Sequence, residues 1–299
     1  MPTPRRELRE RPIGVFDSGF GGLTVLRALM DLLPGEDLVY LGDTGRYPYG
    51  PRPLDQVRCF ARQITGHLVE EFGVKLVVVA CNTAAAAALD ELRARFSVPI
   101  IGVIEPGVTA ALRATRNGSV GVIGTVGTIS SGAYPRAVAE AGVAPATGAP
   151  ADLVAAACPG FVEFVERGEV DSDQVHVLAE RLLSPLVSAD VDTLLLGCTH
   201  YPYLARTIGD VMGRDVVLVS SADETAFAVR DHLVATGMAR AVGTGDGAKI
   251  RAGSLRFLSS GDREWFRSIG QMLFGPELTE VDAVEWGDDL CSDEVAELL

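Results

Sequence analysis

Short apolar runs alternate with longer amphipathic stretches along most of this 299-residue chain. The runs are continuous and rich in valine, isoleucine and leucine, which is typical of strands buried on both faces of a parallel sheet. In the first part of the chain they lie at residues 13–16, 38–41, 76–80 and 99–104. The helices predicted between them cover about 23–33, 54–72 and the alanine-rich stretch after residue 81. This alternation predicts an α/β fold, with a mostly parallel sheet and helices on both faces.

The same pattern starts again in the second third of the chain. The run Val120-Gly121-Val122-Ile123 repeats the type of Ile13-Gly14-Val15-Phe16, and the run that ends at Cys198 repeats the one that ends at Cys81. These paired motifs occur in the same order, which predicts two similar α/β domains related by internal duplication, with the active site in the cleft between them. We expect a disordered leader at 1–12, a first domain of 13–105 plus 223–299 whose tail is mobile from about 288, and a second domain of 106–222.

The charge and the cysteine count narrow the class of protein. The formal net charge of −14 argues against nucleic acid or an anionic membrane as a partner. No apolar run is long enough to span a bilayer, and the charged N-terminus lacks the apolar core of a signal peptide. Five cysteines at irregular spacing suit reduced thiols in a cytosol. We therefore expect a cytoplasmic enzyme that acts on a small molecule.

Two of the cysteines stand where an α/β fold binds its ligands. Cys81 and Cys198 each end an apolar run and are followed by small polar residues, and ligands bind at the carboxyl ends of such strands. Each is expected to start a helix whose N-terminal dipole lowers the thiol pKa from about 8.5, leaving a base or a nucleophile. In facing halves, the two thiols would lie on opposite sides of a substrate. The other three cysteines are interpreted as small core residues: Cys59, Cys158 and Cys291.

The neighbours of these thiols allow more than one interpretation. Asp17, at the end of the first strand, is either a helix N-cap or an acid in the site. His200 lies two residues after Cys198, where it could prepare a thiolate or simply cap or fill the core. The glycines after Asp17 lack the third glycine of a dinucleotide-binding loop.

Metal and cofactor sites are not expected. No cluster of histidine and cysteine has the spacing of metal ligands. The chain has only two lysines, Lys75 and Lys249, and neither is placed to form a Schiff base with pyridoxal phosphate.

Several segments resemble bacterial glutamate racemases of the aspartate/glutamate racemase superfamily. The resemblance covers about residues 13–275 and is carried by IGVFDSGFGGLTVLRAL (13–29), YLGDTGRYPYGPR (40–52), VVACNTA (78–84), GVIGTVGT (121–128) and LLLGCTHYP (194–202). Aspartate racemases of the superfamily typically have glutamate at the position of His200, so the resemblance favours glutamate as substrate. An aspartate racemase, or another amino-acid or hydantoin racemase, is the alternative.

The resemblance implies a cofactor-independent racemisation by two bases. The position of Cys81 corresponds to the residue that removes the α-proton of D-glutamate, and that of Cys198 to the one that acts on L-glutamate. Asp17 and His200 correspond to the groups that assist the first and the second thiol. Glu166 matches a third family carboxylate near the second thiol, although Glu163 lies close enough in sequence to compete for that assignment.

The resemblance also implies the substrate contacts and the setting of the enzyme. Most contact positions are strand-to-helix junctions, where backbone N–H groups and short hydroxyls can hold the carboxylates of glutamate. The positions are Asp17, Ser18, Tyr49, Gly50, Asn82, Thr83, Thr125, Thr128, Thr199 and His200. A member of this family would supply D-glutamate for peptidoglycan synthesis and is expected to form a homodimer.

Two other classes of protein remain as alternatives from the residues alone. A thiol hydrolase or acyltransferase would use Cys198 with His200 and give Cys81 no role. A non-enzymatic binding protein with two α/β halves would need neither thiol.

Overall fold

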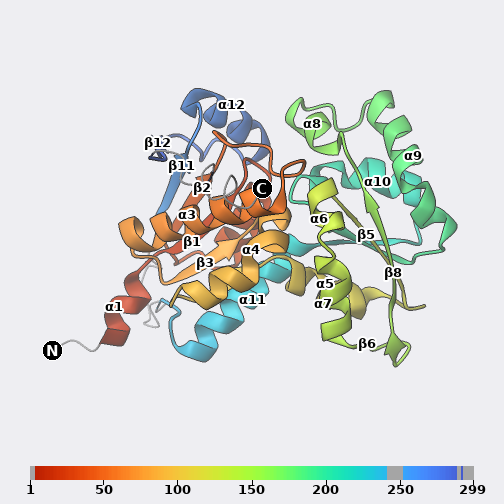
Figure 1. Cartoon of the computed structure of the whole chain (residues 1–299), viewed down its shortest axis with the longest axis horizontal. Coiled ribbons are helices and arrows are strands. Elements are labelled where there is room, and N and C mark those ends of the chain that lie inside the picture. The colour runs from red at the N-terminus through yellow and green to blue at the C-terminus, as the bar shows by residue number, and fades with distance from the viewer. Residues whose placement is uncertain (1–3, 241–251, 288–290, 292–299) are drawn as a thin grey trace.

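Two parallel sheets lie side by side in the computed structural model, which describes residues 4–240, 252–287 and 291 (Figure 1). The larger sheet has the order β12 (Val281–Ala283), β11 (Leu255–Ser259), β2 (Leu38–Gly42), β1 (Ile13–Asp17), β3 (Leu76–Val79) and β4 (Ile100–Gly102). The smaller has the order β10 (Val217–Ser220), β9 (Thr193–Gly197), β5 (Ser119–Gly124) and β8 (Asp152–Ala157). Every pairing within these two sheets is parallel. A short antiparallel hairpin, β6 (Val143–Ala144) with β7 (Ala149–Pro150), stands apart.

Helices connect the strands and cover the sheets. In the larger half they are α1 (Pro4–Glu10), α2 (Leu23–Leu32), α3 (Leu54–Phe72), α4 (Asn82–Arg95) and α12 (Arg263–Leu273). The smaller half carries α5 (Ile104–Ala114), α6 (Val126–Ser130), α7 (Ala133–Ala141), α8 (Phe161–Glu166), α9 (Asp173–Ser188), the 3₁₀-helix η1 (Tyr201–Leu204) and α10 (Ala205–Met212). Helix α11 (Ser221–Thr236) packs against both α2 and α5 and so lies between the halves.

The strand order supports the expected duplication. The order β2-β1-β3-β4 in the larger sheet is matched by β8-β5-β9-β10 in the smaller one. In this match β1 corresponds to β5, and β3 to β9, which are the strands before the two cysteines. The expected α/β class with two mostly parallel sheets is therefore confirmed. The chain boundaries of the two domains stay a prediction, although β11 and β12 do extend the first sheet.

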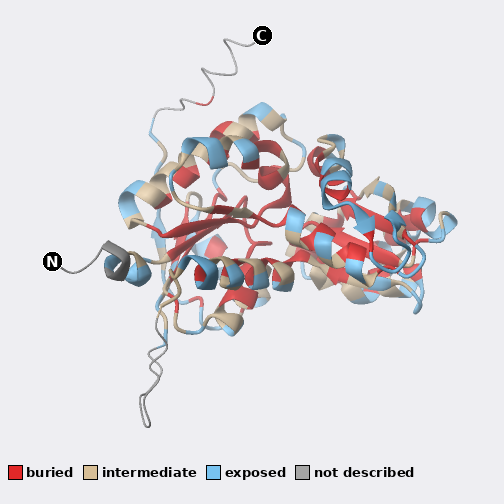
Figure 2. Cartoon of the chain, turned by 90° about the horizontal axis from the view of Figure 1, so that it is seen from below, coloured by how far each residue is buried: buried red, intermediate tan, exposed pale blue. Residues whose placement is uncertain are grey.

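The core follows from the apolar runs. The residues of β1, β2, β3 and β9 are all buried, and the burial view shows the central strands of the larger sheet buried between helices (Figure 2). Val122 of β5 and Leu195 of β9 belong to the same apolar cluster as the larger sheet. The two halves thus share apolar packing. Within the described residues, no helix is both long and apolar enough to cross a membrane.

The expected disordered leader is wrong for the residues that the structure describes. Residues 4–10 form α1, and the helix is fixed by polar contacts at its end. The carbonyl of Arg9 accepts a hydrogen bond from Lys75 Nζ at 2.9 Å, and Arg9 Nε donates to the carbonyl of Gly237 at 2.7 Å. A lysine 66 positions away supplies this contact, and no local pattern could reveal it.

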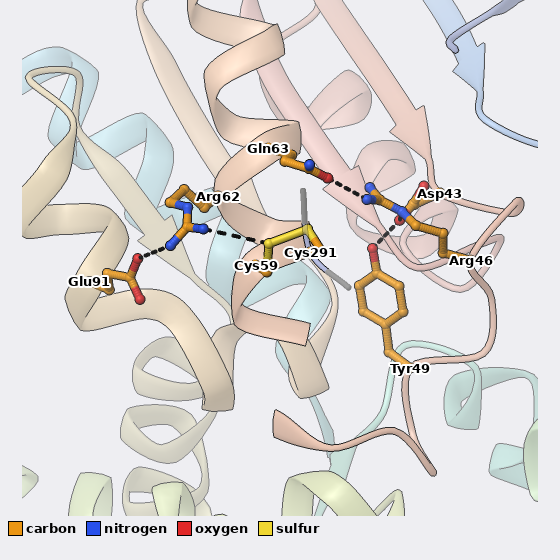
Figure 3. Close-up of a disulfide and its surroundings, with 8 residues drawn as sticks. All are labelled: Asp43, Arg46, Tyr49, Cys59, Arg62, Gln63, Glu91 and Cys291. Carbon is orange, nitrogen blue, oxygen red and sulfur yellow. Dashed lines mark hydrogen bonds and ion pairs between the residues drawn. A yellow bond between two sulfur atoms is a disulfide. The ribbon is translucent and has the colours of Figure 1, made fainter. Parts of the chain in front are cut away.

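The expectation that all five cysteines are reduced is also wrong. Cys59 on α3 forms a disulfide with Cys291, across a Cα–Cα distance of 5.7 Å that suits such a bond (Figure 3). Cys81, Cys158 and Cys198 are free and buried. The expected mobile tail lies outside the described residues, except for Cys291, which is buried. The two partners are 232 positions apart, so their pairing depends on the fold and cannot be read from spacing.

Candidate active site

One small cavity gathers the strand ends of both halves. It has a volume of about 120 Å³, enough for several water molecules or a small solute. Both Cys81 and Cys198 line it. The rest of the wall consists of Ser18, Tyr47, Pro48, Tyr49, Gly50, Pro51, Asn82, Thr83, Thr125, Val126, Cys158, Pro159, Gly160, Val162, Glu163, Thr199 and His200.

Cys81 follows β3 and is the N-cap residue of α4, as the apolar run predicted. Its Sγ lies 3.7 Å from Ser18 Oγ. Burial, followed by the nearby charge of Asp17, raises the pKa of this thiol to about 12, although hydrogen bonds from Ala84 and Ser18 act in the opposite direction. The expectation of a lowered pKa is therefore wrong for Cys81, because the loss of hydration outweighs the favourable groups at the helix N-terminus.

Cys198 follows β9 but does not start an α-helix, contrary to expectation. A turn and the 3₁₀-helix η1 come first, and α10 begins only at Ala205. Its Sγ lies 3.9 Å from His200 Nδ1, and His200 Nε2 lies 3.1 Å from Glu166 Oε1. Cys198, His200 and Glu166 thus form a chain of three interacting side chains.

The histidine in that chain favours its charged form. Burial alone would lower its pKa, but the hydrogen bonds that the ring donates to Cys198 and Glu166, and the charges of these two groups, raise it to about 10. His200 is only 3 % exposed, so water does little to weaken these interactions. The imidazolium is therefore the favoured form of His200 beside the second thiol.

Glu166, rather than Glu163, is the carboxylate that contacts His200. Both residues lie on α8, but they differ in what they face. Glu166 makes the contact with the imidazole, whereas Glu163 lines the cavity. The two carboxylates, three residues apart on one short helix, therefore occupy different places in the site: Glu166 beside His200 and Glu163 in the cavity wall.

Asp17 lies behind the cavity wall and connects the two halves. Its Oδ1 accepts from the backbone N–H of Gly19 at 2.8 Å, and its Oδ2 accepts from Thr199 Oγ1 at 3.2 Å. Burial raises its pKa, although the charge of His200 and these hydrogen bonds act in the opposite direction. Asp17 is therefore a buried acid whose charged form is disfavoured, and it interacts electrostatically with both Cys81 and His200.

Two glycines after Asp17 allow this close packing. A Cβ at Gly21 would lie 2.2 Å from Thr199 Oγ1 and 2.4 Å from His200 Nδ1. A Cβ at Gly22 would lie 2.6 Å from Asp17 Cβ. Gly21 thus allows close approach between the halves and Gly22 close packing within the larger half, so both glycines have a packing role.

A triangle of hydroxyls joins the halves on the other side of the cavity. Thr83 Oγ1 lies 3.0 Å from Thr125 Oγ1 and 3.1 Å from Thr128 Oγ1, which are themselves 2.9 Å apart. The backbone N–H of Gly127 also donates to the carbonyl of Gly50 at 2.9 Å. These contacts hold the first turn of α4, which follows Cys81, and the loop around Gly50 against α6 and its N-cap Thr125.

Most of the expected substrate contacts line the cavity, and their roles stay predictions. Asp17 and Thr128 are the exceptions, because both are fully buried behind the wall. Tyr49 lines the cavity, but its hydroxyl donates to Asp43 and is not offered to a substrate. The residues in the wall are Ser18, Tyr49, Gly50, Asn82, Thr83, Thr125, Thr199 and His200.

Other wall residues were not anticipated from the sequence. Tyr47 and Cys158 both line the cavity, and Cys158 had been interpreted only as a core residue. Tyr134 on α7 accepts a hydrogen bond from Asn82 Nδ2 at 2.9 Å. The run RYPYG around Tyr47 was a usable signal, since it follows a strand end. No local pattern marks Tyr134, which lies in the first turn of α7 and is connected to the cavity wall through Asn82.

Comparison with known proteins places this geometry in a family. The family model described as Asp/Glu/Hydantoin racemase matches residues 13–229. The chain belongs to that family. The racemase domain includes both cysteines and all of the side chains that surround them here.

Curated relatives and solved structures narrow the likeness. The chain is 51 % identical to a glutamate racemase of Parafrankia sp. over 90 % of its length and 93 % of the relative's. It is 48 % identical to that of Acidothermus cellulolyticus, over 92 % and 99 % of the two chains. The glutamate racemase RacE1 of Bacillus anthracis superposes with a TM-score of 0.82 at 38 % identity, covering 93 % of this chain and 98 % of that one. A Francisella tularensis glutamate racemase solved with D-glutamate gives 0.81 at 32 %, with the same coverage.

Proposed function

We propose that this racemase interconverts L- and D-glutamate by two-base chemistry, with Cys81 and Cys198 acting on opposite faces of the α-carbon. The observation that carries the proposal is that two free thiols, at equivalent strand ends of two matching sheets, line one small cavity. Relatives at 51 % and 48 % identity are glutamate racemases, which makes glutamate rather than aspartate the substrate.

In the proposed reaction, one proton is removed from the α-carbon and another is added to its opposite face. The Cys81 thiolate removes the α-proton of D-glutamate, and the Cys198 thiol donates its proton to the opposite face of the carbanion. L-glutamate reacts in the reverse sense, with the roles of the thiols exchanged. The assignment of each thiol to one enantiomer rests on the family resemblance.

The neighbouring groups are suited to hold the protons that the thiols exchange. Asp17 is a buried acid whose pKa is raised, so it can accept the proton that Cys81 must lose. The imidazolium of His200 stabilises a thiolate at Cys198, and Glu166 keeps the ring charged and oriented. Each thiol therefore has its own acid–base partner.

The α-proton is far less acidic than a thiol, so the carbanion needs stabilisation in the site. Asn82 and Thr83 at the start of α4 and Thr199 in the turn after β9 line the cavity, and hydrogen bonds with Tyr134, Thr125 and Asp17 hold their side chains in place. Donors held in place within a site that excludes water stabilise developing charge more than water does. Among the described residues, Asn82 Oδ1 is buried and has no hydrogen-bond partner, which leaves it available to the ammonium group of an amino acid.

The proposal includes no pyridoxal phosphate. Lys75 is buried and is bound to Glu36 Oε2 and to the carbonyls of Arg9 and Met238, so its amine is not available to a cofactor. Lys249 lies outside the described residues. The chemistry is therefore assigned to the two thiols and their partners alone.

A comparison of substrates tests the proposal directly. Purified protein is incubated separately with L-glutamate, D-glutamate, L-aspartate and D-aspartate, and chiral chromatography follows the opposite enantiomer. We expect rapid conversion of both glutamate enantiomers and little of aspartate. Conversion of aspartate at a similar or higher rate would contradict the proposal. A trapped acyl-enzyme at Cys198, with no effect of Cys81→Ala, would indicate a thiol hydrolase instead.

The cellular setting belongs to the same proposal. Supply of D-glutamate for peptidoglycan, a cytoplasmic location and a homodimer are supported by the family resemblance alone. Sedimentation velocity of the full chain tests the homodimer, and a single species with the mass of one chain would contradict it.

A further inference from the structure

A buried carboxylate behind the cavity wall gathers polar contacts from distant parts of the chain. Asp43, fully buried just after β2, accepts from Tyr49 through Oδ2, which also lies 2.8 Å from Arg46 Nε (Figure 3). Its Oδ1 accepts from Ser260 Oγ at 2.6 Å and from Trp286 Nε1 at 2.8 Å. Asp43 thus connects Tyr49, a residue of the cavity wall, to the C-terminal part of the chain.

The C-terminal part reinforces this connection through Arg46. The guanidinium of Arg46 lies between the rings of Phe60 and Trp286, 4.1 Å and 4.4 Å from their centroids. Its NH1 donates to Gln63 Oε1 on α3 at 2.5 Å (Figure 3). An arginine stacked between two rings and bonded at its edge is held in one orientation. Removing Trp286 would therefore release both Arg46 and one side of Asp43.

The disulfide fixes the same region. Cys59 precedes Phe60 on α3, and its partner Cys291 follows Trp286 by five residues. Both cysteines are buried. We call residues 281–287 together with Cys291 the C-terminal clasp. One end of the clasp is hydrogen-bonded in the larger sheet through β12, and the other is bonded covalently to α3.

We propose that the C-terminal clasp positions the Tyr49 wall of the substrate cavity, and that the Cys59–Cys291 disulfide makes this positioning dependent on redox state. The inference rests on the proposed function, since its effect is on glutamate binding. A dithiol reductant cleaves the S–S bond, leaving a thiol at each cysteine while the dithiol becomes a disulfide. Trp286 then loses its tether, Asp43 loses a donor, and Tyr49 loses its fixed partner.

Asp43, Arg46 and Trp286 are positioning residues in this account, because they act through Tyr49. Loss of the clasp should therefore weaken substrate binding more than it slows the chemistry at the thiols. We expect KM to rise about tenfold, which is the change in affinity that corresponds to losing one hydrogen bond to a charged group. We expect kcat to change by no more than about twofold.

The test compares the full chain with its disulfide intact and after treatment with dithiothreitol. Peptide mapping without reductant establishes the Cys59–Cys291 link, and KM and kcat for D-glutamate are measured in both states. Reduction should raise KM, and Cys291→Ser should show the same high KM with or without dithiothreitol. Trp286→Phe keeps the ring but removes the N–H donor, so it should raise KM while the disulfide stays intact.

A second readout does not depend on activity. In a Trp265→Phe background, Trp286 is the only tryptophan, and its emission should shift to longer wavelength when the disulfide is reduced. An unchanged spectrum together with an unchanged KM on reduction would overturn the clasp. Absence of any glutamate racemisation would instead overturn the proposed function, and the emission shift would still decide whether the clasp is released.

Discussion

The two thiols stand at equivalent positions but have unlike neighbours. Cys81 lies beside Ser18 and within the influence of Asp17, whereas Cys198 lies beside the His200–Glu166 pair. A racemase must treat two mirror-image substrates, yet the surroundings that protonate and deprotonate its two bases need not be alike. The difference predicts that the two halves of the reaction respond differently to pH.

The His200–Glu166 pair gives a prediction about stability and pH. The pKa of His200 in the folded state, about 10, lies above its ordinary value of 6.5. The unfolded chain binds fewer protons between these values, so this stabilisation is complete below pH 6.5 and is lost as pH rises through 10. Glu166→Gln should reduce the loss of unfolding free energy between pH 7 and 9.5 by on the order of 1–3 kcal/mol, measured by urea denaturation.

Glu163→Gln is the matched control, because it removes the same charge from the same helix without touching His200. It should keep the pH dependence of the unmodified protein. The Cys81 thiol adds a loss of the same sign, since its pKa of about 12 exceeds the ordinary value of a cysteine thiol. Equal pH dependence in the two variants would contradict the account of His200.

For single residues, the sequence predicted where the two thiols lie but did not predict the acidity of Cys81. A strand end marks where a residue lies, and this placed Cys81, Cys198 and Asp17 together. The acidity of Cys81 depends on how fully the fold removes water from it, which no local pattern records. In the same way, the position of Tyr49 was predictable, but the use of its hydroxyl by Asp43 was not.

Among the elements that surround the cavity, the loop between β1 and α2 leaves no room for a side chain at Gly21. Gly21 approaches Thr199 and His200 so closely that any side chain there must displace them. Gly21→Ala should therefore reduce kcat for both glutamate enantiomers by about a hundredfold, as small displacements of catalytic groups do. Racemisation assays on the folded variant, checked by circular dichroism, measure this.

Gly66→Ala is the control for that substitution. Gly66 lies within α3, and a Cβ there meets only Phe96, at 3.9 Å and beyond. Alanine should raise the unfolding free energy by roughly 0.5–1 kcal/mol through helix propensity, with activity unchanged. If Gly21→Ala were as active as Gly66→Ala, the close approach would have no role in the site.

The elements were predictable where the apolar pattern was strong. The helix expected at 54–72 is α3 as observed, and the buried strands of both sheets fall within a residue or two of the runs. Strand β8 was not anticipated, because its alanine-rich sequence is only half buried and gives no clear periodicity. The leader helix α1 and the 3₁₀-helix after Cys198 make contacts with residues far away in the sequence, so the local sequence pattern did not predict them either.

In the whole molecule, contacts between the halves converge on the cavity. Asp17 bonds with Thr199, Thr24 Oγ1 donates to the carbonyl of Thr199 at 3.3 Å, and Gly127 bonds with Gly50. The matching strand orders put the equivalent ends of β3 and β9 at one cavity. The internal repeat in the sequence predicted this arrangement, whereas the extra strands β11 and β12 and the disulfide had no counterpart in the repeat.

The disulfide gives a prediction for the stability of the whole chain. It closes a loop of 232 residues, which restricts the unfolded state. The double variant Cys59→Ser/Cys291→Ser should lose about 2–4 kcal/mol of unfolding free energy and several degrees of Tm. Denaturation with and without dithiothreitol measures this. Dithiothreitol should lower the stability of the unmodified protein and leave the double variant unchanged, and equal stability of both proteins without reductant would contradict the prediction.

We assign one thiol to each face of the glutamate α-carbon. Racemisation in heavy water by the unmodified protein, Cys81→Ser and Cys198→Ser, starting from each enantiomer and with α-deuterium followed by NMR, tests this assignment. The unmodified protein should place deuterium mainly in the product enantiomer, and each single variant should lose racemisation from both directions. Racemisation at the unmodified rate by either single variant would contradict the two-base account.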